Sequence, residues 1–176
     1  MKTFETENLI IRSSIREDID YFYKWELKPE VTEFFSIKDN QTLEDVILKY
    51  DNDEKDPFAE QFTICFKDGT PIGRIVLADI IEGWKGEIWR IYIADTNLRG
   101  KGYGKEAMKI MMKYCFEELD FKRLYLDHYT GNPASKLYLS LGFKYEGVLR
   151  KNCRKNGILY DVHLMSMLRE EYDELK

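Results

Sequence analysis

The sequence predicts a single mixed α/β domain, on three observations. Alternating apolar residues at 62–66 and a second apolar run at 72–80 flank the turn signal Asp68-Gly69, which is typical of a β-hairpin. From residue 88 onward, strand and helix patterns alternate, which indicates a sheet with helices packed on it. The chain of 176 residues is 44% hydrophobic and 34% charged, without repeats or linkers, so we expect one domain spanning 1–176.

The first third of the chain predicts one strand and two helices. Residues 9–12 form a short apolar run suited to a strand. Ser14 and Glu17 have capping-box spacing, so a helix is expected to start there, and it should end before Pro29. Thr42 precedes a second run with helical periodicity, to Tyr50. The acidic stretch 51–60 is expected to be an exposed loop.

The second half predicts strands and helices in turn. Residues 88–93 are expected to be a strand, 105–118 an amphipathic helix and 123–128 the next strand. Asn132 and Pro133 suit the cap and the first turn of a further helix. Two final strands are predicted at 143–149 and 160–168.

The stretch 98–105 is the most informative part of the sequence. Three alternating glycines lie between a predicted strand and a predicted helix, where main-chain N–H groups and a partial positive charge suit a pyrophosphate. The residues of this stretch are Leu98, Arg99, Gly100, Lys101, Gly102, Tyr103, Gly104 and Lys105. A basic, glycine-rich surface turn is the alternative. The spacing fits neither a dinucleotide fingerprint nor a P-loop, since position 105 is Lys and Glu106 follows it.

Two motifs resemble those of the GNAT N-acetyltransferases. Arg99, Gly102 and Gly104 match the Arg/Gln-x-x-Gly-x-Gly/Ala signature, and Asn132 to Tyr138 followed by Gly142-Phe143 match a later motif. The resemblance covers about residues 8–170. Residues 9–12 and 146–150 are similar to the branch that contains spermidine and ribosomal-protein alanine N-acetyltransferases. The resemblance to the family implies a GNAT fold, which is a mixed, mostly antiparallel twisted sheet flanked by helices.

The resemblance also implies acetyl-CoA as co-substrate and no metal. The pyrophosphate is expected on residues 99–105. The main chain of Ile91, Tyr92 and Ile93 is expected to pair with the pantetheine arm like another strand. Asn132 and Ser135, from the second motif, are expected to complete the CoA site.

Two residues are the candidates for catalysis. Tyr138 is expected to protonate the departing thiolate, since a tyrosine stays protonated at neutral pH; core packing on its helix is the alternative. Glu87 is the candidate base, and strand alternation predicts that it shares a face with Trp89 and Ile91. A solvent-facing Glu87 is its alternative. His128 is a secondary base candidate because its ordinary pKa lies near neutrality.

The acceptor is expected to be a small-molecule amine or a protein N-terminus. Phe34, Phe35, Trp84 and Trp89 are candidates for an aromatic pocket, with Glu87 and His128 beside them. A polyamine such as spermidine, an N-terminal amine of a protein and an aminoglycoside-like amine all remain open. An acyl-CoA sensor without turnover is the alternative from another class.

Composition bears on partners and location. A net charge of −5 disfavours nucleic-acid binding, and three scattered cysteines indicate neither disulfides nor a zinc site. The first residues lack a signal-peptide pattern, and no apolar run is long enough to span a bilayer, so we expect no membrane association and a cytoplasmic protein. The resemblance leaves open whether the chain forms a homodimer or a larger homo-oligomer.

Overall fold

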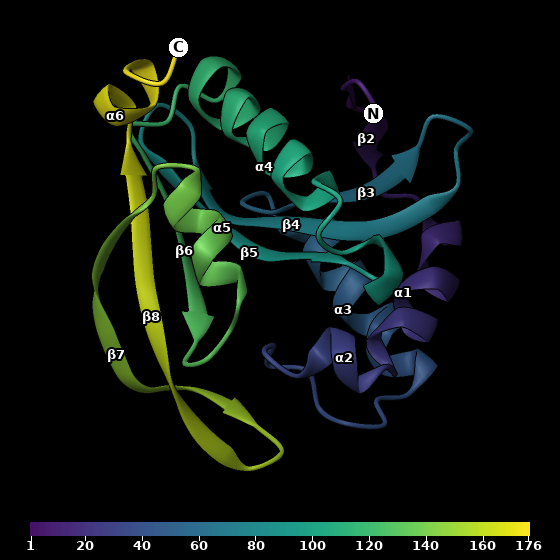
Figure 1. Cartoon of the computed structure of the whole chain (residues 1–176). Helices are drawn as coiled ribbons and strands as arrows, with labels where there is room; N and C mark the ends of the chain where they lie inside the picture. The colour runs from purple at the N-terminus through teal and green to yellow at the C-terminus, as the bar shows by residue number, and fades with distance from the viewer.

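The computed structural model describes residues 1–176 and contains one eight-stranded sheet (Figure 1). The strand order is β1-β2-β3-β4-β5-β6-β8-β7, and β5 and β6 are the one parallel pair of neighbours. The mixed, mostly antiparallel sheet expected from the sequence is therefore confirmed. The strands are β1 Thr3–Glu5, β2 Leu9–Ser13, β3 Glu60–Phe66, β4 Pro71–Ile81, β5 Lys85–Ile93, β6 Arg123–Tyr129, β7 Lys144–Lys155 and β8 Ile158–Leu168.

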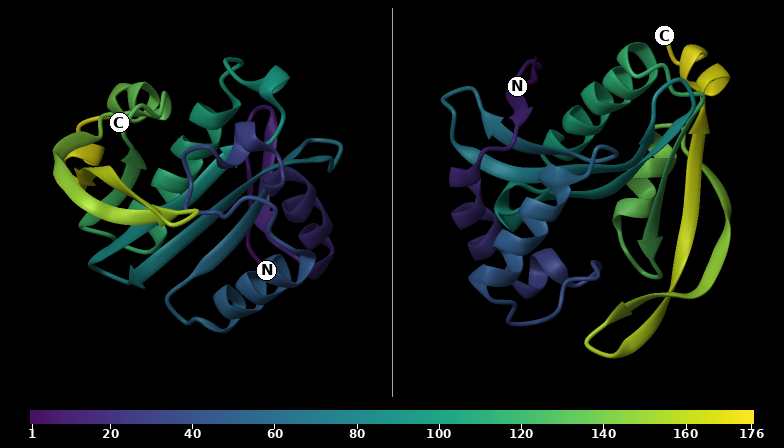
Figure 2. Two further views of the ribbon diagram at one scale, coloured as in Figure 1. Left: turned by 90° about the horizontal axis from the view of Figure 1, so that it is seen from below. Right: turned by 180° about the vertical axis from the view of Figure 1, so that it is seen from behind.

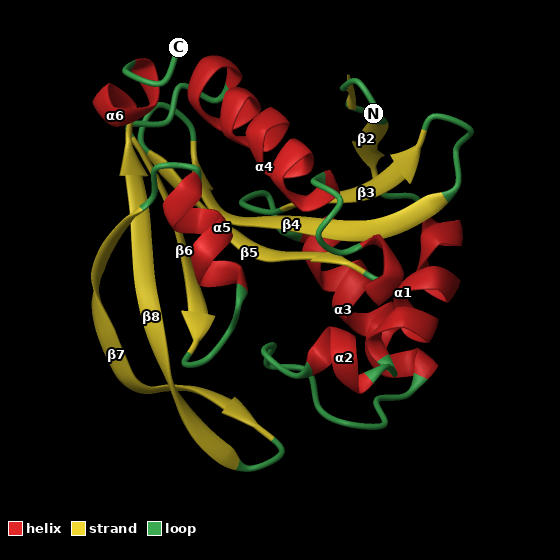
Figure 3. Ribbon diagram, viewed as in Figure 1, coloured by secondary structure: helices red, strands yellow, loops and turns green.

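Helices cover both faces of the sheet (Figures 1 and 3). α4 and α5 lie on one face, α1, α2 and α3 lie on the other, and α6 follows β8. The helices are α1 Ile19–Glu26, α2 Pro29–Thr32, α3 Leu43–Lys55, α4 Tyr103–Lys113, α5 Ala134–Ser140 and α6 Arg169–Asp173. Short 3-10 turns precede α1 and α4, and a π-helical turn, Tyr114–Glu118, extends α4.

Each helical layer has its own core. On one face, the buried Ala107, Met108 and Met111 of α4 pack on the sheet at helical spacing. On the other face, Phe22 and Trp25 of α1 pack with α3 residues and with Tyr92 of β5. This second helical layer covers the β2–β5 half of the sheet, so the same face of β6, β8 and β7 has no helix on it (Figure 2).

β5 and β6 separate part of the way along the sheet. β5 pairs with β4 from Lys85 to Ile93, but with β6 only from Lys85 to Glu87, opposite residues 123–125. Beyond that point β6 stays paired with β8 while β5 stays with β4. The facing edges of the two strands therefore carry main-chain N–H and C=O groups without strand partners, which is an edge on which an extended ligand can pair.

A β-bulge in β5 corrects one prediction from strand alternation. Leu77 of β4 aligns with Ile88 and Val76 aligns with Arg90, so Trp89 is an extra residue. Glu87 and Trp89 share the face toward α1 and α3, as expected. Ile91 does not share it, because the extra residue shifts the alternation, and Ile91 packs against the core under α4.

Several element boundaries also differ from the sequence predictions. Ser14 does not cap a helix: it is buried, and its hydroxyl binds that of Thr63 at 2.9 Å. The carboxylate of Asp18 accepts from the Ile15 N–H instead, at 2.9 Å. Thr42 caps α3 as predicted, but α3 continues to Lys55. Residues 51–55 are therefore helical and not part of a loop, with Asp53 buried and paired with Lys49 one turn earlier.

The β7–β8 hairpin reaches across the open face to the segment between α2 and α3 (Figure 2). Asn156 and Gly157 turn the hairpin with positive φ at both residues, as a two-residue turn requires. The Asn156 Oδ1 accepts from the Asp39 N–H at 3.0 Å, and the Lys155 ammonium donates to the Thr32 carbonyl. The hairpin tip therefore closes the lower end of the gap between β5 and β6. No helix of the chain is long and apolar enough to cross a membrane.

Candidate active site

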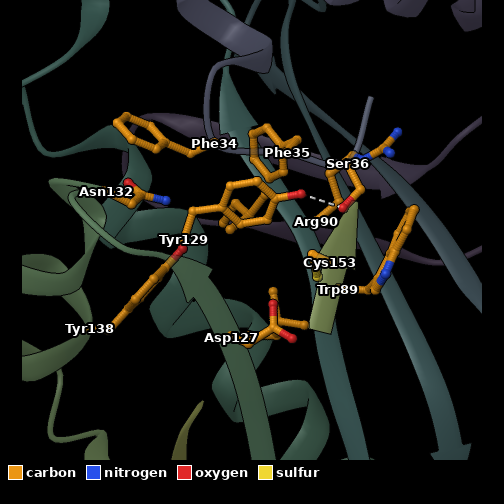
Figure 4. A pocket seen from close by; sticks show the side chains of 12 residues that line it. Phe34, Phe35, Ser36, Trp89, Arg90, Asp127, Tyr129, Asn132, Tyr138 and Cys153 are labelled. Atoms are coloured by element: carbon orange, nitrogen blue, oxygen red, sulfur yellow. Dashed lines mark hydrogen bonds between the residues drawn. The ribbon is translucent and has the colours of Figure 1, made fainter. Parts of the chain in front are cut away.

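A cavity lies where β5 and β6 separate, and it joins the two faces of the sheet (Figure 4). Tyr138 of α5 borders it on one side, and the segment between α2 and α3 borders it on the other. The residues that line it are Phe34, Phe35, Ser36, Ile88, Trp89, Arg90, Ile91, Asp127, Tyr129, Asn132, Tyr138 and Cys153. The arrangement lets two reactants meet from opposite faces of the sheet.

The glycine loop leads from this gap to the N-terminus of α4. Gly100 and Gly102 have φ of +76° and +90°, a region that disfavours side chains. Gly102 caps α4, and a Cβ there would meet no atom within 4 Å, so the main chain is open to a ligand. Lys105 and Lys109 line a shallow depression beside Gly102, together with the carboxylates of Glu7 and Glu106. The N-terminus of α4, the glycines before it and the charge of the lysines together suit the binding of a pyrophosphate.

Other members of the expected CoA site are placed by their packing. The Arg99 guanidinium donates to the Glu30 carbonyl at 2.8 Å, which ties the loop to α2. The half-buried Tyr103 ring packs edge-on against Phe66, with 5.3 Å between the ring centroids. Lys101 is exposed, and Gly104 follows in the first turn of α4.

The free edge of β5 lies within reach of the second motif. Ile91 lines the cavity, and Tyr92 and Ile93 follow it on the same edge. The Tyr92 side chain is buried on the α1 face, and its carbonyl lies against Gly73 of β4. The alternation along an antiparallel strand therefore leaves the main-chain groups of Ile91 and Ile93 on the edge that faces the gap. Asn132 lines the cavity and caps α5, accepting from the Ala134 N–H at 2.9 Å. Ser135 lies in the first turn, where its N–H donates to the Asn132 carbonyl.

Tyr138 lies at the centre of the cavity wall. It is only 7% exposed, packs against Phe143 at 6.3 Å between ring centroids, and directs its hydroxyl into the cavity (Figure 4). Burial, and next the negative charge of Asp127, raise the pKa of Tyr138 to about 12. The hydroxyl therefore stays protonated at neutral pH and is able to donate a proton.

Carboxylates gather on the open face of the sheet at the point of separation. Burial, followed by the charges of Asp127 and Asp79, raises the pKa of Glu87 to about 8. Burial also raises the pKa of Asp127, which lines the cavity, whereas Glu87 lies beside the cavity without lining it. The Tyr125 hydroxyl donates to Asp79 at 2.9 Å and fixes that carboxylate.

The wall toward α1 is aromatic and carries one buried cation. Phe34, Phe35 and Trp89 line it, as the sequence suggested. The Arg90 guanidinium lies 4.5 Å from the Trp89 ring centroid and donates to Glu26 at 3.1 Å. Arg90 is therefore neutralised by an ion pair with α1.

Two residues expected at the acceptor pocket do not line the cavity, although the His128 ring lies 6.2 Å from the Tyr138 ring. Trp84 is 55% exposed at the β4–β5 turn, where Lys85 packs over its ring. It lies at the paired end of β5, away from the gap. His128 points to the face opposite Asp127, stacks on His163 at 5.2 Å and donates from Nδ1 to the Tyr129 carbonyl. Burial lowers the pKa of His128, so it stays neutral.

Sequence reasoning missed five polar or sulfur-bearing residues of the cavity, which are Ser36, Arg90, Asp127, Tyr129 and Cys153. One signal was available. Tyr125, Asp127 and Tyr129 alternate with Leu124, Leu126 and His128 along one strand, and polar residues at alternate positions predict a face without a covering helix. The 2.5 Å hydrogen bond between the hydroxyls of Ser36 and Tyr129 joins segments 93 residues apart and had no signal.

The profile of the acetyltransferase (GNAT) domain family matches residues 8–144, so the chain belongs to this family. It is an N-acetyltransferase of the GNAT type, and the family uses acetyl-CoA. The chain is 30% identical to the uncharacterized N-acetyltransferase p20 of Bacillus licheniformis, over 98% of this chain and 99% of that one. It is 26% identical to the spermidine N(1)-acetyltransferase of Escherichia coli K12, over 92% and 87% of the two chains.

A solved structure shows the same fold. Spermidine N-acetyltransferase from Vibrio cholerae, in complex with CoA and spermine, superposes with a TM-score of 0.83 at 23% identity. The match covers 95% of this chain and 99% of that one. The GNAT fold expected from the two motifs is confirmed.

Proposed function

We propose that this enzyme transfers the acetyl group of acetyl-CoA directly to an amino group of a polyamine such as spermidine. The cavity between β5 and β6 carries the proposal: it holds a protonated tyrosine on one side and an aromatic, negatively charged wall on the other. Both reactants of an acyl transfer have a place in it, and neither has to form a covalent bond with the protein.

The charge of the cavity favours a cationic acceptor. Its one basic residue, Arg90, is paired with Glu26, whereas Glu87 and Asp127 have no Lys or Arg among the groups that shift their pKa. Phe34, Phe35 and Trp89 offer aromatic rings to a cationic amine. The relatives that are named spermidine N-acetyltransferases agree with this acceptor class.

Residues of this chain supply each step. Residues 99–105 and the N-terminus of α4 hold the pyrophosphate, and the free edge of β5 at Ile91, Tyr92 and Ile93 pairs with the pantetheine arm. Main-chain N–H groups on that edge polarise the thioester carbonyl. The amine attacks after losing a proton to the carboxylates near Glu87. Tyr138 then donates its proton to the departing sulfur.

Thiol release from acetyl-CoA across a panel of amines tests the proposal. The panel holds spermidine, spermine, a lysine derivative, an aminoglycoside and peptides with free N-terminal Ala or Ser. We expect turnover with the polyamines. Turnover with peptides alone would move the assignment to an N-terminal acetylase. Tight acetyl-CoA binding with no turnover on any amine would favour the sensor alternative.

A further inference from the structure

We propose that Asp127 is the residue that takes the proton from the acceptor amine, and that Glu87 is a positioning residue behind it. The proposal rests on the proposed amine acetylation and deepens it. Asp127 lines the cavity together with Tyr138, and Glu87 does not. In Figure 4 the Asp127 carboxylate lies between Tyr138 and the Trp89 side of the cavity. An amine held between these two walls therefore meets Asp127 first.

The separation of β5 and β6 is what exposes Asp127 to the cavity. Along β6, Leu124 and Leu126 point into the core under α4, so Asp127 points to the opposite face. Glu87 is still aligned with Tyr125, the residue two positions before Asp127. At Asp127 strand β5 has already moved away, and the cavity takes the place of the neighbouring strand.

The Asp127 carboxyl has no ion-pair partner. Burial raises its pKa, and His128 on the other face is the group that opposes this rise. Burial, and next the charges of Asp127 and Asp79, in turn raise the pKa of Glu87, so the Glu87 and Asp127 carboxylates repel each other. Two further neighbours of Asp127 are Cys153 of β7 and Tyr138 of α5. Burial is the main cause that raises the pKa of each, and the charge of Asp127 adds to the rise. Arg90 is engaged by Glu26. Because Glu87 and Asp127 interact, the two carboxylates titrate as a pair.

The protons balance through two routes. The acceptor arrives as an ammonium ion and gives one proton to the Asp127 carboxylate, which later passes it to solvent. The freed lone pair forms the N–C bond to the thioester carbon while the C–S bond breaks. The Tyr138 hydroxyl gives its proton to sulfur, and the second proton of the nitrogen restores that hydroxyl. The products are the amide, free CoA thiol and one proton.

The test compares pH–rate profiles of the whole chain and of Asp127→Asn, with Asp20→Asn as control. Asp20 is an exposed residue of α1, so its substitution removes the same charge far from the cavity. At pH 7 we expect Asp127→Asn to lower kcat/KM for the preferred amine by about 100-fold, the order of a lost general base. Asp20→Asn should match the wild type. Thermal unfolding at each pH checks that all three proteins remain folded.

The shape of the profile separates catalysis from packing. Without a base, Asp127→Asn can use only amine that is already neutral. Its rate should therefore rise about tenfold per pH unit until the pH reaches the amine's pKa, near 10. The difference in rate between the variant and the wild type should become smaller over the same range. We expect Glu87→Gln to keep most turnover and to move the acidic limb of the profile to lower pH, because it removes a negative neighbour.

Four outcomes would overturn the proposal. A deficit of Asp127→Asn that is the same at every pH would indicate packing alone. Wild-type behaviour of Asp127→Asn with loss in Glu87→Gln would assign the base to Glu87. If the wild type acetylates no amine, both the proposed function and this proposal are wrong. If the wild type is active and Asp127→Asn is equally active, only this proposal is wrong.

Discussion

Glu87 of β5 and Tyr125 of β6 are the last aligned pair before the two strands separate. The cavity opens immediately beyond them, with Asp127 on one strand and Ile88, Trp89 and Ile91 on the other. The bulge at Trp89 lies two residues after Glu87 in β5 and helps this strand bend away from β6. One local break in the pairing therefore produces the free strand edge, the passage between the two faces and the exposed carboxylate.

Replacing Tyr138 with Phe should lower kcat and leave acetyl-CoA affinity unchanged. The variant loses only the hydroxyl, which faces the cavity and is not used in the protein's own hydrogen bonding, so packing is preserved. Loss of a general acid is expected to cost about 100-fold in kcat. Steady-state kinetics with calorimetric titration of CoA measures both quantities. Unchanged turnover would remove Tyr138 from the mechanism.

Gly102→Val should abolish CoA binding through the glycine loop. The substitution adds a branched side chain at φ +90°, on the main chain that is expected to face the pyrophosphate. Gly69→Val is the matched control, because Gly69 also has φ of +90° and open space around it but lies in the β3–β4 turn. Both variants should lose about 1–3 kcal/mol of stability from backbone strain. Equal CoA affinity in the two would argue against the assigned pyrophosphate site.

Activity should rise with pH through about 8. The pKa of Glu87 is raised to about 8 by burial and by Asp127 and Asp79, so Glu87 and the base Asp127, which titrate as a pair, are both ionised only above that pH. Asp79→Asn removes one negative neighbour and should shift the rise to lower pH. The Tyr125 hydroxyl can still donate to the Asn oxygen, so the local structure should persist. A profile that is flat from pH 6 to 9 would contradict this assignment.

The same pKa has a consequence for stability. Glu87 binds its proton more tightly in the folded protein than in the unfolded chain, where the pKa is near 4.5. Stability should therefore fall as pH rises from about 4.5 to about 8, since folding holds a proton that the unfolded chain releases. Glu87→Gln should remove this part of the pH dependence. Denaturant unfolding at pH 5 and pH 8 for both proteins measures it, and identical pH dependence in the two would refute the shift.

Glu26 should be a major contributor to stability. Its carboxylate accepts from Arg74 at 2.9 Å, Arg90 at 3.1 Å, Tyr92 at 2.9 Å and Gln41 at 2.9 Å, and both arginines are buried. Glu26→Leu leaves two buried cations without a carboxylate and should lower the free energy of unfolding by about 3–5 kcal/mol. Tyr92→Phe removes one bond and should cost about 1.5–3 kcal/mol. A smaller loss in Glu26→Leu than in Tyr92→Phe would contradict this network.

The sequence predicts most of the fold because its patterns are local. Alternation, capping and turn residues place the hairpin at Asp68-Gly69, the cap at Thr42 and the glycine loop before α4. The bulge at Trp89 appears in the pairing of β5 with β4, so no local pattern predicts that Ile91 changes face. Asp127 and Trp84 show the same limit. Asp127 lines the cavity and Trp84 does not. The difference depends on where β5 and β6 separate, which is a property of the whole sheet.

A structure of the complex with CoA tests the central claim most directly. We predict that the pantetheine arm lies along the β5 edge at Ile91, Tyr92 and Ile93, that the pyrophosphate meets the N–H groups around Gly102, and that the CoA sulfur lies within hydrogen-bond reach of the Tyr138 hydroxyl. CoA bound elsewhere on the sheet, with its sulfur outside the cavity between β5 and β6, would contradict the account.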